Sequence, residues 1–287
     1  RISRRGIRLG HLFQDDLLER ITILVERVNA VLDGVYPDVT KRRIDPKRLY
    51  KDLLKQREHI RKYVGDTHNF IHKAIENGEE VLMEGAQGSL LDLGFGTYPF
   101  VTSSHTISGS ACVNAGLGPR QINKVLGIAK AYITRVGAGP FPTKMDTAWN
   151  EAVQKKGNEF GATTGRPRDC GWLDIPLLRY ANRLNGFSGI ILTKADILGG
   201  MGDIKICTSW TWENKEYKDV PEDSRVWNES IPNYVSLEGW PDFSGLQKWD
   251  DLPSGLKKYC HFIEKNSGVE IYAVSTGPGI DDIAWKN

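Results

Sequence analysis

The chain has 287 residues, of which 40% are hydrophobic and 26% are charged, so it can bury a substantial core as one large domain or two. Its 38 lysines and arginines nearly balance 36 aspartates and glutamates, and the formal charge of +2 gives no general argument for binding nucleic acid or an acidic membrane. The sequence has no apolar run near the roughly 18 residues of a membrane span and no signal-peptide pattern. Because the net charge is close to zero, any basic binding site must be confined to one part of the surface.

The first 79 residues are expected to be helical, behind a basic opening made of Arg1, Arg4, Arg5 and Arg8. Apolar residues recur at helical spacing from Leu17 to Leu32, which predicts an amphipathic helix. A second helical region is expected from Pro46 to the C-cap pair Asn77-Gly78. Its predicted core face is Leu49, Leu53, Leu54, Ile60, Val64, Phe70 and Ile71.

Neither the histidines nor the cysteines of the chain form a metal-binding pattern. His68 and His72 stand four residues apart, but Asn69 occupies the position where a zincin has glutamate, so we expect solvated or capping histidines. The cysteines lie far apart, which argues against a zinc knuckle and against a disulfide framework. We expect no metal site in this chain and a reducing, cytoplasmic location. The four cysteines are Cys112, Cys170, Cys207 and Cys260.

Residues 80–287 change character to short apolar runs, each followed by a glycine-rich or polar loop. Such runs predict buried strands, and helical stretches are expected between them at 174–184 and 255–266. This pattern predicts an α/β fold with a mostly parallel sheet flanked by helices, continuous with the helical region, and a strand-and-loop insertion at 209–250. Ligands of such sheets bind at the carboxyl ends of strands, so four loops are candidate site walls. The runs are VLMEGAQGSLLD, KVLGIAKAYITRVGAG, GIILTKADIL and VEIYAVSTGPG.

One loop, within the stretch GNEFGATTGRPRDCGWLD, has the composition of an anion clamp. Small residues let the backbone approach a ligand closely, and exposed N–H groups and threonine hydroxyls can donate to a carboxylate or phosphate. Two arginines separated by one residue can grip the same anion or two different ones. The residues concerned are Gly161, Ala162, Thr163, Thr164, Gly165, Arg166 and Arg168.

The loop LTKADIL has features of a guanine site. Asp196 follows an apolar strand, and its carboxylate can accept hydrogen bonds from both N1–H and the exocyclic amine of guanine, which adenine cannot offer. Lys194 can lay its aliphatic stem along the purine face. The later STG loop, Ser275 to Gly277, stands where guanine-nucleotide proteins back the base. The sequence has neither GxxxxGK[ST] nor GxGxxG, so the phosphate cradle of such a site is missing from these residues.

Five blocks, in this order and at these separations, resemble adenylosuccinate synthetase: EGAQGSLLDLGFGTYPFVTSS, TRVGAGPFPT, GNEFGATTGRPR, LTKADIL and STGP. The resemblance runs from Arg4-Arg5-Gly6 almost to the C-terminus. It implies a fold related to P-loop NTPases and an enzyme that couples GTP hydrolysis to joining IMP and L-aspartate. The implied route transfers the γ-phosphoryl group of GTP to O6 of IMP, after which the aspartate amine displaces phosphate.

The resemblance also implies roles for individual residues. Gln87 and Arg166 would be the catalytic residues of this chain. IMP would be bound by Arg4, Gln87, Thr102, Val136 and Arg166, with Arg4 reaching the other subunit of a homodimer. L-Aspartate would be bound by Ala162, Thr163, Thr164, Gly165, Arg166 and Arg168. GTP would be bound by Arg168, Lys194, Asp196, Ser275, Thr276 and Gly277.

The sequence departs from the family pattern in three ways. The phosphate loop, catalytic aspartate, general-acid histidine and Mg²⁺ ligands would precede Arg1, so we expect this chain to be part of a longer protein and inactive alone. Pro167 and Asp169 interrupt the usual arginine run, and Asp169 is expected to neutralise part of the clamp. The short segment after STGP also differs from the usual continuation. Two alternatives stay open, a 2-aminoadenylosuccinate synthetase acting on dGMP and a non-catalytic guanine-nucleotide-binding or assembly module.

Overall fold

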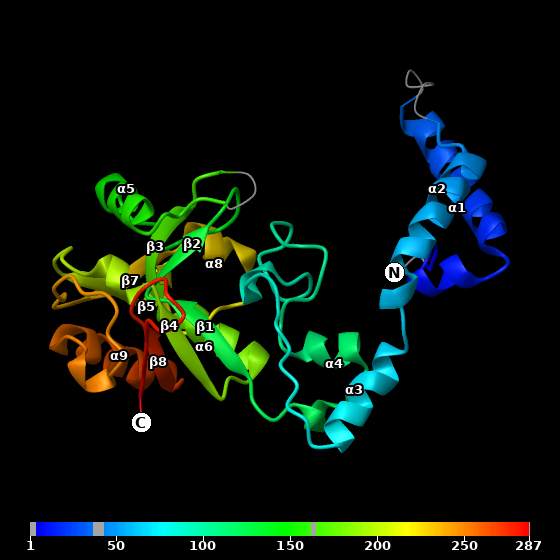
Figure 1. Cartoon of the computed structure of the whole chain (residues 1–287). Coiled ribbons are helices and arrows are strands. Elements are labelled where there is room, and N and C mark those ends of the chain that lie inside the picture. Colours follow the sequence, from blue (N-terminus) through cyan, green and yellow to red (C-terminus); the bar gives the residue numbers. More distant parts are fainter. Residues whose placement is uncertain (1–3, 37–42, 162–164, 287) are drawn as a thin grey trace. The chain divides into compact units, whose positions relative to one another are not determined.

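The computed structural model describes residues 4–36, 43–161 and 165–286. The chain forms two compact units, Arg1–Val81 and Leu82–Asn287 (Figure 1). Each unit has its own buried core, so each is described separately.

The first unit is helical, as the sequence predicts. Its core contains Leu12, Leu17, Ile21 and Val25, so the predicted amphipathic helix is confirmed. Phe70 is 75% exposed, so its predicted core position is wrong. The second helical region is divided between Ile60 and Thr67, and the helix that follows contains no buried residue. The elements are η1 (Leu9–Phe13), α1 (Leu17–Val35), α2 (Pro46–Ile60), η3 (Arg61–Tyr63) and α3 (Thr67–Glu76).

The second unit contains a four-stranded sheet, sheet one, with the strand order β1-β4-β8-β9. The first three strands are parallel, and β9 is antiparallel to β8. Ile190 and Leu192 of the central strand are fully buried, which explains why this strand reads as a continuous apolar run. The strands are β1 (Leu126–Lys130), β4 (Gly189–Thr193), β8 (Ile271–Ser275) and β9 (Ile283–Trp285).

A second sheet, sheet two, has five strands and is mainly antiparallel. Only the β3 and β5 pair is parallel among its described ladders. The β5–β6 connection is a two-residue turn in which Glu213 and Asn214 both have positive φ, as tight antiparallel hairpins require. The strands are β2 (Tyr132–Arg135), β3 (Asp169–Asp174), β5 (Ile204–Trp212), β6 (Lys215–Tyr217) and β7 (Ile231–Leu237).

Four helices of this unit, α5, α6, α8 and α9, lie around the two sheets (Figure 1). Asp174 ends β3 and caps α6, because its Oδ1 accepts from the backbone N–H of Leu177 at 3.0 Å. Its other carboxylate oxygen, Oδ2, accepts from Trp210 Nε1 at 2.9 Å. The helix packs against β5 and α9. The helical elements are η4 (Ser89–Leu91), α4 (Gly109–Ala115), η5 (Pro119–Gln121), α5 (Thr147–Lys156), α6 (Ile175–Asn185), α7 (Ala195–Leu198), α8 (Ser224–Glu229), η6 (Trp249–Asp251) and α9 (Ser254–Ser267).

The predicted α/β class and the two helices after residue 170 are confirmed, but three details differ. The run predicted at 81–83 forms no strand in the described chain, and Leu82 is 92% exposed because no neighbouring strand pairs with it. The run at 124–136 forms two strands rather than one, because the chain passes from sheet one to sheet two at Ala131. The region 209–250 contributes β6 and β7 to sheet two and also contains α8.

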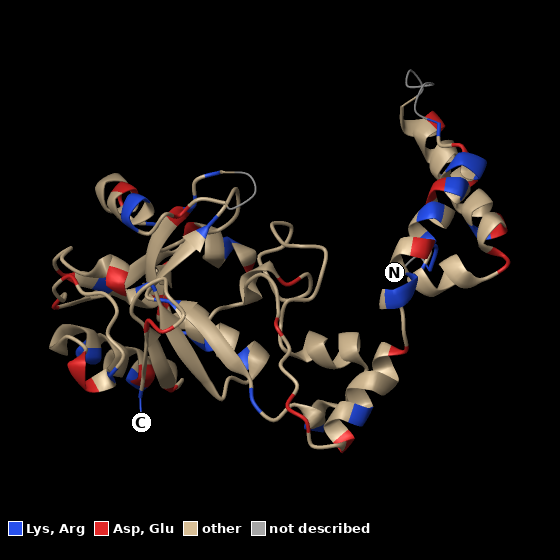
Figure 2. Ribbon diagram, viewed as in Figure 1, with Lys and Arg blue, Asp and Glu red and all other residues tan. Residues whose placement is uncertain are grey.

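The charged residues follow the near balance of the composition. Acidic and basic residues are interspersed along α1, α2 and α9 (Figure 2). Many of them pair on the surface, such as Arg20 with Asp16 and Lys258 with Glu238. No helix within the described ranges is both long enough and apolar enough to cross a membrane.

Candidate functional site

The predicted guanine residues come together at one edge of sheet one. Because β4 pairs in parallel with β1 and β8, the C-terminal ends of these three strands share an edge. Lys130 ends β1, Thr193 ends β4 and Ser275 ends β8. The LTKADIL and STG loops therefore follow neighbouring strands, as the sequence predicts for two parts of one site.

Lys194 and Asp196 follow β4 in a tight turn. Lys194 has φ of 63°, a left-handed conformation that is uncommon outside glycine, and its Nζ donates to the carbonyl oxygen of Gly157 at 2.9 Å. Asp196 lies half-buried on α7. Burial raises the pKa of Asp196, while the backbone amides of Asp196 and Ile197 and the charge of Lys194 act in the opposite direction. A partly desolvated carboxylate at this edge is suited to accepting hydrogen bonds from a base.

The STG loop is fixed by its own hydrogen bonds. Ser275 Oγ donates to the carbonyl oxygen of Gly277 at 3.1 Å, and the buried Thr276 donates through Oγ1 to the carbonyl oxygen of Leu246 at 2.7 Å. A Cβ on Gly277 would lie 2.5 Å from Asp282 Oδ2, so a side chain at this position would displace the Asp282 carboxylate. The loop presents backbone and a serine at the strand end.

The anion-clamp loop projects from a short two-stranded base. Phe160 and Pro167 form an antiparallel bridge, and the Gly161 amide donates to the carbonyl oxygen of Arg166 at 2.8 Å. Ala162, Thr163 and Thr164 lie outside the described residues. Gly165 has φ of +64° and is exposed, as is Arg166.

Arg168, the second arginine of the loop, is held by a buried partner. Its Nη1 donates to Glu159 Oε2 at 2.9 Å, and its side chain is one third exposed. Asp169 forms its ion pair with Lys144 at 2.9 Å, so its carboxylate is engaged away from both arginines of the loop. The ion pair of Arg168 is therefore with Glu159, whereas Asp169 pairs with Lys144.

The predicted IMP residues Gln87 and Thr102 belong to one folded loop, residues 85–108. Gln87 is exposed and has φ of 64°, a backbone strain that is typical of functional positions. The Thr102 amide donates to the carbonyl oxygen of Leu91 at 2.9 Å, and its Oγ1 lies 3.4 Å from Ser104 Oγ.

Asp92 organises this 85–108 loop, and the sequence patterns did not indicate it. Its carboxylate is fully buried and accepts from the backbone amides of Gly94 at 2.8 Å and Thr106 at 2.7 Å, and it lies 3.2 Å from His105 Nδ1. Burial by itself would raise the pKa of Asp92, but these donors outweigh it and hold the pKa below its usual value.

The α6 helix anchors the same loop. Tyr180 Oη donates to the carbonyl oxygen of Phe95 at 2.7 Å. Asn185 Oδ1 accepts from the Ser108 amide at 2.8 Å, and its Nδ2 donates to Ser89 Oγ at 2.9 Å. The loop is therefore attached to the core at both ends and in the middle.

Val136 and Arg135 lie at the end of β2. Val136 is 47% exposed, so it is available to a ligand and is not strand core. Arg135 was not predicted as a site residue. Its Nη2 donates to Thr97 Oγ1 at 3.1 Å and its Nε to the carbonyl oxygen of Ala138 at 3.1 Å, which ties β2 to the 85–108 loop. Burial lowers the pKa of Arg135.

Arg4 belongs to the first unit. It is exposed, has φ of 56° and forms no ion pair within the described part of the chain. Arg5 and Arg8 are also exposed, and Arg1 lies outside the described residues. The structure therefore leaves Arg4 free to contact an anion from elsewhere.

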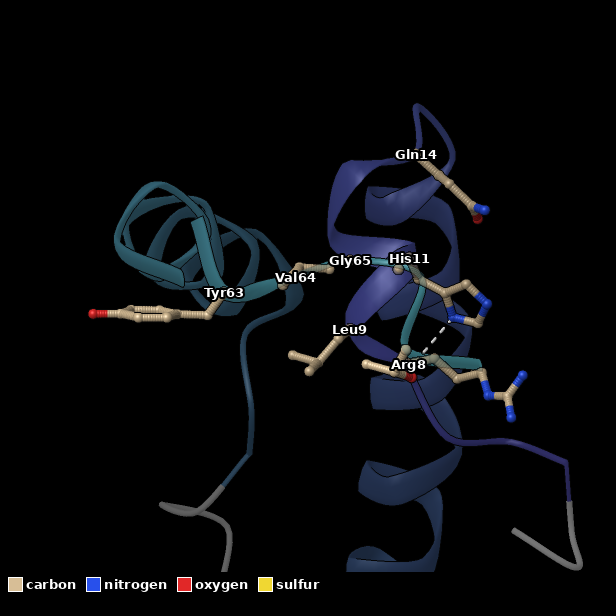
Figure 3. Close-up of a pocket in the computed structure, with 9 residues that line it drawn as sticks. Arg8, Leu9, His11, Gln14, Tyr63, Val64 and Gly65 are labelled. Atoms are coloured by element: carbon tan, nitrogen blue, oxygen red, sulfur yellow. Dashed lines mark hydrogen bonds between the residues drawn. The ribbon is translucent and has the colours of Figure 1, made fainter. Parts of the chain in front are cut away.

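Two surface hollows lie away from the predicted ligand loops in the sequence. One is lined by Arg8, Leu9, His11, Gln14 and Tyr63 with their neighbours, and Figure 3 shows the Arg8 amide donating to His11 Nδ1. The other is lined by Glu58, His59, Arg61 and Lys62. Both are surface depressions of the first unit, whereas the predicted ligand residues other than Arg4 belong to the second.

The described ranges hold no group of three or more histidine, cysteine, aspartate or glutamate side chains that could hold a metal ion. The four cysteines are free. His68 and His72 have their ring centroids 4.5 Å apart but form no such group with a third ligand among the residues that the structure describes.

Comparison with known proteins supports a purine-nucleotide ligase class. The family model for adenylosuccinate synthetase matches residues 1–284. The adenylosuccinate synthetase of Thermodesulfovibrio yellowstonii is 43% identical over 288 residues, which are 100% of this chain and 67% of the relative. That of Salinibacter ruber is 44% identical over 97% of this chain and 63% of the relative. The chain thus spans about two thirds of the length of these curated relatives.

Solved structures agree. A structure of fully ligated adenylosuccinate synthetase from Plasmodium falciparum matches with a TM-score of 0.89 and 34% identity, over 100% of this chain and 67% of that one. A cyanophage S-2L succinoaminodeoxyadenylate synthetase matches with a TM-score of 0.50 and 16% identity, over 80% of this chain and 54% of that one, which is a likeness of fold alone. The chain belongs to the adenylosuccinate synthetase family.

The buried Asp92 gives a first testable prediction. In an Asp92→Asn variant, one carboxylate oxygen becomes an amide group, so at least one backbone N–H loses its acceptor at a cost of about 1–3 kcal/mol. Unfolding by denaturant should show this loss at pH 7, and amide exchange should accelerate at Gly94 and Thr106. The exposed Asp281→Asn is the matched control.

The sign of the pH dependence follows from the lowered pKa. A carboxyl group whose pKa is lower in the folded protein stabilises it above its unfolded pKa, near 4, and this contribution disappears as the pH falls through the folded value. The difference between wild type and Asp92→Asn should therefore shrink in acid. A difference that is constant down to pH 2, or unchanged amide exchange, would show that Asp92 does not order the loop.

Proposed function

We propose that this chain is the part of an adenylosuccinate synthetase that binds guanine, L-aspartate and most of IMP, in an enzyme that joins IMP and L-aspartate with hydrolysis of GTP. Membership of the family supports this activity. The single structural observation that carries the proposal is that the segment Gly157–Glu159 contacts both predicted ligand loops. It contacts Lys194 of the guanine loop through a backbone carbonyl and Arg168 of the anion clamp through a carboxylate.

The proposed reaction has two steps. The γ-phosphoryl group of GTP moves to O6 of IMP, and the amine of L-aspartate then attacks C6 and displaces phosphate. Negative charge develops on the leaving GDP in the first step and on the leaving phosphate in the second, so positioned cations and donors matter more than a protein nucleophile. Arg166 and Arg168 would neutralise the aspartate carboxylates, and Gln87 would orient the hypoxanthine ring.

The guanine base would lie at the edge of sheet one. Asp196 would accept from its N1–H and exocyclic amine, Lys194 would lie along its face, and residues Ser275–Gly277 would back it. Ala162–Gly165 would complete the L-aspartate pocket, Thr102 would bind the 5′-phosphate of IMP, and Val136 would contact its ribose.

Mg²⁺ belongs to the proposal as a cofactor that would neutralise the GTP phosphates. The described residues of this chain include no group of three or more acidic, histidine or cysteine side chains that could hold the ion. The cytoplasm is the proposed location, which is consistent with four free cysteines.

The first test of the proposal is the reaction itself. The full-length protein should form adenylosuccinate from IMP, L-aspartate and GTP with Mg²⁺, measured by absorbance and by mass of the product. The 287-residue chain alone should form none, because its sequence contains no phosphate-loop motif.

Three results would contradict this proposal. Efficient turnover of dGMP but not IMP would favour the 2-aminoadenylosuccinate reaction. GTP binding without turnover of either nucleotide would favour a non-catalytic module. Turnover by the 287-residue chain, above an Arg166→Ala control, would show that the missing phosphate loop is not required.

Base selection gives the next prediction. In the full-length protein, Asp196→Asn should weaken GTP binding by about 2–3 kcal/mol, since a charge-assisted pair is lost. The amide should also improve use of xanthosine triphosphate, because it can donate to the 2-oxo group. The measurement is KM for both nucleotides, with the exposed Asp203→Asn as control. An unchanged preference for GTP would remove Asp196 from the site.

A composite dimer site is the last part of the proposal. The exposed Arg4, unpaired within the described part of the chain, would bind the IMP phosphate held by the partner subunit of a homodimer. Arg4→Leu should raise KM for IMP and leave GTP binding nearly unchanged.

Mixing Arg4→Leu with Arg166→Leu should restore part of the activity, because one site of the heterodimer then combines an intact Arg4 from one subunit with an intact Arg166 from the other. Activity of the mixture should be measured after subunit exchange has been demonstrated by mass. A mixture as inactive as either parent would refute the shared site.

A further inference from the structure

Glu159 is a buried carboxylate surrounded by donors from three different elements. Its side chain is 1% exposed. Lys130 Nζ and Tyr132 Oη each donate to Oε1 at 2.7 Å, and Arg168 Nη1 donates to Oε2 at 2.9 Å. Lys130 and Tyr132 lie on β1 and β2, whereas Arg168 lies in the anion-clamp loop, so this one carboxylate joins both sheets to the loop.

The backbone around Glu159 is built to hold this position. Its amide donates to the carbonyl oxygen of Gln154 at 2.9 Å, and its own carbonyl oxygen accepts from the Arg168 amide at 2.9 Å. A Cβ at Gly157 would lie 2.5 Å from Tyr132 Oη, so glycine is required for the tyrosine to approach. Glu159 and Arg168 are thus joined twice, through backbone and side chain.

The charges favour an ionised Glu159. Burial by itself would raise its pKa, but Lys130, Tyr132 and Arg168 outweigh this and keep the pKa below its usual value. Burial lowers the pKa of Lys130, Glu159 raises it, and the positive charges of Arg168 and Lys194 lower it further. Without the carboxylate, these cations would repel one another and Arg168 would lose its buried acceptor.

We propose that Glu159 is a positioning residue that fixes the Arg168 guanidinium for a carboxylate of L-aspartate. Glu159 Oε2 accepts a hydrogen bond from only one nitrogen of Arg168, which leaves the other guanidinium donors for a ligand. Two cations, Lys130 and Arg168, face one buried anion, so an excess positive charge remains for the incoming carboxylate. This inference rests on the proposed function for the identity of the ligand, but the positioning of Arg168 can be measured independently.

The test uses Glu159→Gln in the full-length protein. The glutamine keeps the shape but turns an NH₂ group toward donors on one side, so Arg168 or the pair Lys130 and Tyr132 loses its acceptor. We expect KM for L-aspartate to rise about tenfold, the factor for loss of one charge-assisted hydrogen bond, with KM for IMP within about twofold of wild type. Glu151→Gln on the exposed surface of α5 is the matched control.

A double-mutant cycle separates positioning from general destabilisation. If Glu159 acts through Arg168, then Glu159→Gln should add less than about a twofold rise in KM for L-aspartate to an Arg168→Ala background. If Glu159→Gln raises KM for L-aspartate as much in the Arg168→Ala background as in the wild type, the inference is overturned. Equal rises in KM for all substrates would also overturn it. If Glu159→Gln does not fold, Tyr132→Phe removes one donor to the carboxylate and should raise KM for L-aspartate selectively to a smaller extent.

A second readout does not depend on activity. NMR of the arginine side chains should show slow rotation of the Arg168 guanidinium in the wild type and fast rotation in Glu159→Gln. If the wild-type protein forms no adenylosuccinate, the proposed function fails, yet the rotation still decides whether Glu159 positions Arg168. Equal rotation rates in the two proteins would refute the positioning role.

Discussion

The parallel pairing of β4 with β1 on one side and β8 on the other is the constraint on which the candidate site depends. It brings Lys130, Thr193 and Ser275 to one edge of a sheet although they are far apart in sequence. The loops that follow can then face one ligand. Since the strands are buried and apolar, packing in the core fixes their spacing. The loops that follow them are therefore held on a rigid base.

Buried carboxylates then fix the loops that the sheet brings together. Asp92 satisfies backbone amides of the 85–108 loop, and Glu159 satisfies the cations around the anion clamp. In both cases a buried charge is tolerated because several donors surround it, and removal of either would leave those donors without acceptors. Each of the two carboxylates therefore stabilises the conformation of the loop around it.

The sequence was informative where the physical signal is local. Continuous apolar runs predicted β4 and β8, and the glycine-rich and polar residues after them indicated the loops. The strand predicted at 81–83 is wrong, because an apolar run becomes a strand only when another strand pairs with it. Leu82 has no such partner strand among the described residues. The division of the 124–136 run at Ala131 likewise depends on pairing partners.

The sequence could not indicate the role of Glu159. It lies inside the anion-clamp stretch, but Tyr132 and Lys130, which contact it, are 27 and 29 residues away, and such a network exists only once both sheets have formed. Arg135 was passed over for the same reason, since its acceptors Thr97 and Phe100 lie in another loop. Composition marked the polar loops, but tertiary contacts determine which polar residues position the others.

The most direct test of this account is a crystal structure of the full-length protein with IMP, GDP and an unreactive analogue of L-aspartate. The account predicts guanine bonded to Asp196 at the edge of sheet one and a carboxylate of the analogue against Arg168, with the Glu159 pair intact. Guanine bound away from β4 and β8, or an aspartate analogue that does not contact the anion-clamp loop, would contradict it.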